Sequence, residues 1–116
     1  NKGTFGFIND NTMGLFGDSQ QEKELKALML KASETMQDLI DNAKASYAVT
    51  AYTEKLIKQL ANEVNTLYQK SANLSPMKQA SIQVKIDGEF VSLTNAKMGF
   101  VLFMKNYERE MGVKFI

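Results

Sequence analysis

The stretch IQVKIDGEFVSL, residues 82–93, decides the fold. Asp87-Gly88 favours a two-residue type I′ turn, because both central positions of that turn need positive φ. Closing the turn there pairs residues 82–86 with residues 89–93, and directly paired residues share a face of the hairpin. One face then carries Ile82, Val84, Ile86, Val91 and Leu93, and the other carries Gln83, Lys85, Phe90 and Ser92. The turn and the alternation agree on one register, so the stretch predicts a β-hairpin with one apolar face.

A helix is expected directly after the hairpin. An isolated hairpin is marginally stable in water, so its apolar face needs a cover. Residues 95–111 supply one, with Thr94 or Asn95 as N-cap and Gly112 as the C-terminal stop. The helical stripe consists of Phe100, Phe103, Met104, Tyr107 and Met111. Val101 and Leu102 lie off that stripe, so we expect this helix to be packed between the hairpin and a second helix.

The second helix is predicted over residues 19–71, which contain neither Gly nor Pro and are rich in helix formers. Ser19 and Glu22 have the spacing of a capping box. After the helix, Pro76 removes a backbone donor and pushes Ser75 out of helical geometry, so we expect the helix to end before that point.

This long segment is amphipathic and resembles a coiled coil in its spacing. Apolar residues follow a heptad in both halves, whereas Ser46, Thr50 and Thr53 leave a weak centre. The positions that we predict to contact a partner are Leu25, Met29, Met36, Leu39, Ile57, Leu60, Val64 and Leu67.

Two structures fit the heptad pattern. One is an unbroken helix of about 75 Å at 1.5 Å per residue. The other breaks near residues 42–46 into two helices that fold back on each other. No Gly or Pro supplies a tight turn there, which favours the unbroken helix. The last helix, about 25 Å long, would then leave most of the seam uncovered, and an uncovered apolar seam usually marks association. We therefore expect a protein partner, first of all another copy of the chain.

The predicted organisation is a flexible N-terminal segment, residues 1–18, followed by a single helical domain over residues 19–116. The N-terminal segment is rich in Gly, Phe and Asn and shows no helical or strand period. Its apolar anchors, Phe5, Phe7, Leu15 and Phe16, are expected to pack on a neighbouring surface. The fold class is thus mainly α with a small β-hairpin.

Composition argues against several functions. The net charge is +1, and only one of the 14 basic residues is an arginine, so specific nucleic-acid recognition is not expected. No apolar run approaches the ~20 residues of a membrane-spanning helix, which favours a soluble chain. The absence of Cys leaves the compartment open, with export possible, and the chain starts at Asn1, so a preceding signal would not be seen.

Catalytic and ligand-binding motifs are lacking as well. The chain has no His and no Cys, the commonest general base and the thiolate ligand. Glu34, Asp38 and Asp41 share a helical face, but we interpret them as a solvated acidic surface. No catalytic residue, metal site, cofactor or small-molecule substrate is predicted.

These observations favour a non-enzymatic structural protein that self-associates through the long amphipathic helix. Subunits of bacterial secretion systems, pili and phage particles are of this general kind, which is a fold-level analogy. The alternative is a chaperone or adaptor that holds a partner helix on the seam.

Overall fold

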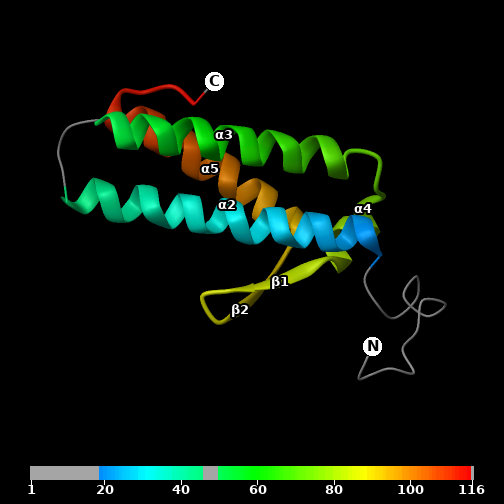
Figure 1. Ribbon diagram of the computed structural model, residues 1–116. Helices are drawn as coiled ribbons and strands as arrows, with labels where there is room; N and C mark the ends of the chain where they lie inside the picture. Colours follow the sequence, from blue (N-terminus) through cyan, green and yellow to red (C-terminus); the bar gives the residue numbers. More distant parts are fainter. Residues whose placement is uncertain (1–18, 46–49, 116) are drawn as a thin grey trace.

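The computed structural model describes residues 19–45 and 50–115. The predicted N-terminal segment, residues 1–18, and its Phe and Leu anchors lie outside the described residues. The elements in chain order are α2 (Gln20–Ala45), α3 (Ala51–Ser71), α4 (Pro76–Ser81), β1 (Gln83–Ile86), β2 (Glu89–Ser92) and α5 (Leu93–Met111). The predicted fold class is confirmed: long helices are combined with a two-stranded hairpin and a C-terminal helix (Figure 1).

The prediction of one unbroken helix over residues 19–71 is wrong. α2 and α3 are separate helices that lie antiparallel side by side (Figure 1). Near one end of the pair, Lys70 Nζ lies 3.6 Å from Glu24 Oε1, and in the middle Gln59 Nε2 donates to Thr35 Oγ1 over 3.1 Å.

Two local features explain the break. Thr50 has extended backbone angles, φ −98° and ψ 170°, and its hydroxyl accepts a hydrogen bond from Thr53 N, so it caps a new helix. Thr53 Oγ1 also accepts a hydrogen bond from Asn42 of α2. The small polar centre of the heptad gains little from burial, whereas folding back lets the two apolar halves cover each other.

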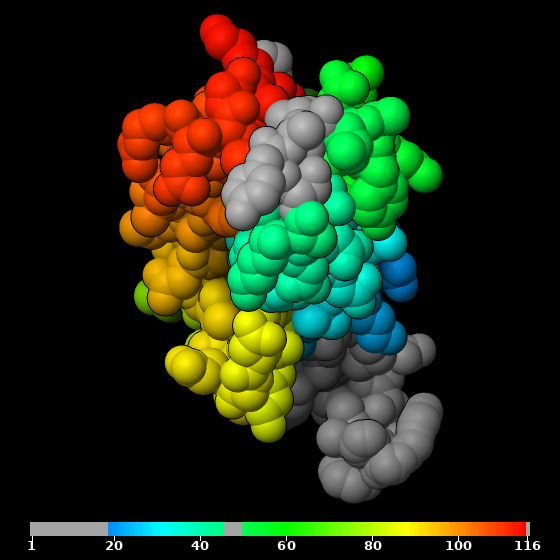
Figure 2. Space-filling view, turned by 90° about the vertical axis from the view of Figure 1, so that its left-hand side faces the viewer, coloured from blue at the N-terminus to red at the C-terminus, as the bar shows by residue number. Residues whose placement is uncertain are grey.

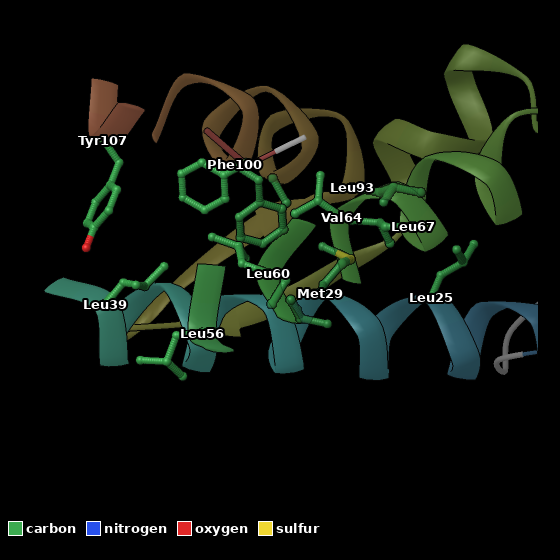
Figure 3. Close-up of a cluster of buried hydrophobic side chains, with 14 of the residues drawn as sticks. Leu25, Met29, Leu39, Leu56, Leu60, Val64, Leu67, Leu93, Phe100 and Tyr107 are labelled. Atoms are coloured by element: carbon green, nitrogen blue, oxygen red, sulfur yellow. The ribbon is translucent and has the colours of Figure 1, made fainter. Parts of the chain in front are cut away.

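The core lies between α2, α3 and α5. Figure 3 shows leucines of α2 and α3 pointing toward Phe100 and Tyr107 of α5. Leu25, Leu39, Leu60 and Leu67 have no exposed surface at all. Burying such a side chain contributes roughly 1.5–3 kcal/mol to the free energy of folding. These leucines therefore help to hold the three helices together.

The hairpin has the predicted register. Val84 pairs with Val91 and Lys85 with Phe90, and the turn residues Asp87 and Gly88 both have positive φ, at 53° and 84°. The inner face packs against α2 and α5, where Val84 is buried. The hairpin therefore covers one side of the helical core, as its alternation predicts.

The chain between α3 and the hairpin contains a short helix, α4, that was not predicted from the sequence. Ser75 caps α4 through a hydrogen bond that its hydroxyl accepts from Lys78 N, and Pro76 occupies the first turn. Proline is well tolerated at that position because its missing N–H would have no partner there anyway. Pro76 thus opens a helix in addition to following one.

α5 begins at Leu93 with Ser92 as its N-cap, slightly earlier than predicted. Gly112, at φ 69°, ends it as predicted. The helix packs on α2, α3, α4 and β2 but is not covered all round, since Leu102 keeps 60% of its surface exposed. Among the described helices, none is both long and apolar enough to cross a membrane.

Candidate interaction surface

The residues predicted to contact a partner lie inside the chain's own core. Seven of them are buried, Leu25, Met29, Leu39, Ile57, Leu60, Val64 and Leu67, while Met36 is half-buried against them. The periodicity identified them correctly as packing residues. The expectation that they form an uncovered seam depended on an unbroken helix. It is wrong because the helix is broken, and α3 and α5 of the same chain cover α2.

A different apolar surface remains exposed, on the side of α5 that faces away from the core. Asn95, Met98, Gly99, Leu102 and Lys105 lie on one side of the helix, because each is three or four residues from another member of the set, and all are exposed. We call these five residues the outer face of α5. Met98 and Leu102 keep 65% and 60% of their surface exposed. Figure 2 shows α5, in orange, at one edge of the molecule next to the hairpin, in yellow.

Gly99 is an unexpected residue at the centre of the outer face. It lies well inside α5, where glycine is less favourable than alanine by about 1 kcal/mol. Its backbone does not have the positive φ of Gly88 and Gly112, and a Cβ built on it would meet nothing within 4 Å. The fold of the described residues therefore gives no reason for glycine at this position.

Two hollows flank the outer face, and Gly99 lines both. One is an open depression of about 420 Å³ beside α3, bounded by Tyr68, Met98 and Leu102. The other is a pocket of about 180 Å³ between α2, the hairpin and α5. Grooves on both sides of an exposed helix give protruding side chains of a partner places to enter.

Lys97 fixes the N-terminal half of α5 beneath this surface. Its Nζ donates to Ser71 Oγ over 2.9 Å and to Gln79 Oε1 over 3.0 Å, and it lies 4.5 Å from the centre of the Tyr68 ring. Tyr68 in turn donates to the Lys97 carbonyl over 3.3 Å. Burial lowers the pKa of the Lys97 ammonium, because it disfavours the charged form. Lys97 therefore ties α3, α4 and α5 together, and its contacts describe a structural role.

The opposite end of α5 is held by aromatic packing. The Tyr107 ring centre lies 5.7 Å from that of Phe103 and 5.6 Å from that of Phe115. Its buried hydroxyl has no hydrogen-bond partner among the described residues, and burial raises the pKa of the phenol. Both ends of α5 are thus anchored, so its outer face is presented on a fixed helix.

The acidic residues of α2 do not gather into a site. Glu34, Asp38 and Asp41 are exposed, and Asp41 accepts a hydrogen bond from Gln37 of the same helix. Within residues 19–45 and 50–115, no group of three or more acidic residues is placed to hold a metal ion.

The outer face of α5 was not predicted from the sequence. Leu102 lies off the core stripe, but the prediction that α5 is packed between the hairpin and a second helix implied that Leu102 would be covered. A helix-interior glycine between Met98 and Leu102 was the available signal. No protein-family model, curated protein or solved structure matches the chain.

Proposed function

We propose that the chain is a non-enzymatic assembly protein that associates with further copies of itself through the outer face of α5. The observation that carries the proposal is the pair of exposed apolar side chains, Met98 and Leu102, on either side of a glycine that the fold does not require. Glycine at a helix surface allows another backbone to approach closely.

The charge pattern favours a second copy in antiparallel orientation. The outer face is uncharged from Asn95 to Leu102 and becomes basic at Lys105, followed by Arg109. In an antiparallel pair, Lys105 of each copy lies beside the uncharged Met98 end of the other. A parallel pair would place the two lysines against each other, which is unfavourable. Both orientations are compatible with the twofold symmetry that is commonest among protein dimers, so the charge pattern decides between them.

The size of the face indicates a weak contact. Two copies would bury the exposed parts of four large side chains, worth about 4–7 kcal/mol if each complete burial contributes 1.5–3 kcal/mol. Association costs at least about 4 kcal/mol in lost freedom of motion. The surplus is then at most about 3 kcal/mol, which corresponds to a dissociation constant of several millimolar or weaker for one contact and suits an assembly in which many copies act together.

A place in a bacterial secretion system, a pilus or a phage particle remains part of the proposal. It is supported by the helical architecture and by the absence of His and Cys in the composition, and it rests on analogy between folds.

Sedimentation equilibrium from about 0.1 mM to about 5 mM tests the self-association, because that range reaches a dissociation constant of several millimolar. Leu102→Ala removes about three carbons per copy, and with 60% of the side chain available for burial we expect the dissociation constant to rise on the order of a hundredfold. Leu30→Ala is the matched control, since Leu30 is also exposed, at 42%, but lies on α2.

A wild-type chain that stays monomeric over the whole range would contradict self-association. So would equal effects of the two substitutions. A strict monomer would instead favour the adaptor function, in which the depression beside Tyr68 receives a helix of another protein.

A further inference from the structure

The pocket between α2, the hairpin and α5 borders the outer face of α5 and shares Asn95 and Gly99 with it, but it does not include Met98 or Leu102. Its walls are mostly apolar, with Met36 from α2, Ile86 and Val91 from the hairpin, and Phe100 from α5. Ser33 and Asn95 add a hydroxyl and an amide. Ile86, Val91 and Met36 are only half-buried, so the described residues leave part of this apolar wall uncovered.

The volume of the pocket matches one aromatic ring. It measures about 180 Å³, and an apolar protein cavity of about 150 Å³ is large enough to bind benzene. The apolar walls would leave a charged head group without partners, so a phenyl ring suits them better than a charged side chain. The serine and asparagine can pair with the backbone of the segment that carries the ring.

We propose that this pocket binds a phenylalanine from the stretch GTFGF, residues 3–7 of the same chain. The stretch carries Phe5 and Phe7, each beside a glycine that permits close approach of the backbone. The proposal goes beyond the self-association of α5 and does not depend on it.

Chain length selects this stretch over the other phenylalanine near the start of the chain, Phe16. Ser33 is fourteen residues from Ser19, so the pocket lies about 21 Å along α2, and at 100° per residue the two positions fall on nearly the same side of the helix. An extended chain covers at most about 3.6 Å per residue, so Phe16 reaches only about 11 Å from Ser19. Phe7, twelve residues from Ser19, reaches about 40 Å. Within one chain, Phe5 and Phe7 reach the pocket and Phe16 does not.

Disulfide trapping tests the contact in the full chain, which has no native cysteine. Thr4→Cys and Ser33→Cys place one thiol next to Phe5 and the other at the pocket wall, and they leave Gly6 in place. The rate of intrachain disulfide formation in a glutathione buffer is read from gel mobility at about 1 µM protein, far below a weak self-association constant. Circular dichroism of each variant checks that the helical content is retained.

We expect the rate to fall about tenfold when Phe5 and Phe7 are both changed to Ala in this double-cysteine chain, because the apolar anchor is lost. Phe16→Ala in the same chain is the matched control and should leave the rate unchanged.

Equal rates with and without Phe5 and Phe7 would overturn the proposal, since the disulfide would then report chance encounters. Disulfide-linked dimers as the main product would overturn it too, in favour of a pocket filled by another copy. Leu102→Ala should not affect the trapping rate, so a failure here is distinguishable from a failure of the α5 contact.

Discussion

Gly99→Ala should have opposite effects on the stability of one chain and on the association between chains. In the single chain, the added methyl meets nothing within 4 Å and lies on the exposed side of α5. Alanine is favoured over glycine inside a helix by about 0.8–1.0 kcal/mol, so the free energy of unfolding should rise by about that amount. For a domain of this size, the midpoint of thermal unfolding then rises by roughly 4–8 °C.

In the associated state, the same methyl would stand where a second helix packs. Overfilling a packed contact costs typically 1–3 kcal/mol, which raises the dissociation constant by roughly 5–150-fold. Urea unfolding at about 1 µM, below the range of a weak contact, measures the first effect, and sedimentation equilibrium measures the second. Asn62→Ala on α3 is the control: it is exposed and improves helix propensity by roughly half a kcal/mol, and it should leave association unchanged. If Gly99→Ala stabilised the chain and left self-association intact, the outer face of α5 would not be the contact surface.

Three further substitutions test the interior. Leu60→Ala should lower the free energy of unfolding by about 2–5 kcal/mol, because Leu60 is fully buried between the helices; a loss below about 1 kcal/mol in urea unfolding would place it outside the core. Tyr107→Phe should be neutral or slightly stabilising at neutral pH, since the buried hydroxyl has no partner among the described residues. Burial raises the pKa of Tyr107 above the ordinary 10.0. Above pH 10 the phenol therefore loses its proton in the unfolded chain first, and the free energy of unfolding of the wild-type chain falls as the pH rises. Unfolding curves measured below and above pH 10 should show no such fall for the Phe variant. Lys97→Met should cost about 1 kcal/mol through its lost hydrogen bonds. The pKa of Lys97 is lowered from 10.5, so the lysine loses its proton in the folded chain at a lower pH than in the unfolded chain. The free energy of unfolding of the wild-type chain therefore rises as the pH approaches 10.5. If the Met variant showed the same rise, Lys97 would not be its cause.

Local sequence signals predicted the elements whose geometry depends on neighbouring residues. The Asp87-Gly88 turn fixes both the positive φ values and the pairing of the strands, so the register of the hairpin followed from twelve residues. Gly112 likewise marked the end of α5 because its φ of 69° is unfavourable for other residues.

The arrangement of α2 and α3 could not be read from periodicity. A heptad gives the same pattern whether its two halves cover each other or contact another chain. The hydroxyl of Thr50 was the signal for the break, but a threonine cap has no turn geometry as evident as that of Gly or Pro. Which apolar residues are exposed depends on whether residues 20–71 form one helix or two helices that fold back on each other. Once α3 folds back onto α2, the apolar seam is internal, and Met98 and Leu102 of α5 are among the apolar residues that stay exposed.

The most direct test of this fold is the distance between spin labels at Glu24→Cys and Lys70→Cys, measured by pulsed electron paramagnetic resonance. The labelled chain is diluted with unlabelled wild-type chain so that each measured distance lies within one molecule. In the folded-back arrangement the two native side chains are 3.6 Å apart, and we expect the labels to lie about 10–20 Å apart once the length of their linkers is included. In an unbroken helix, 46 residues would separate them by about 69 Å. A distance near that value would contradict the internal packing of the seam and return the partner contact to the long helix.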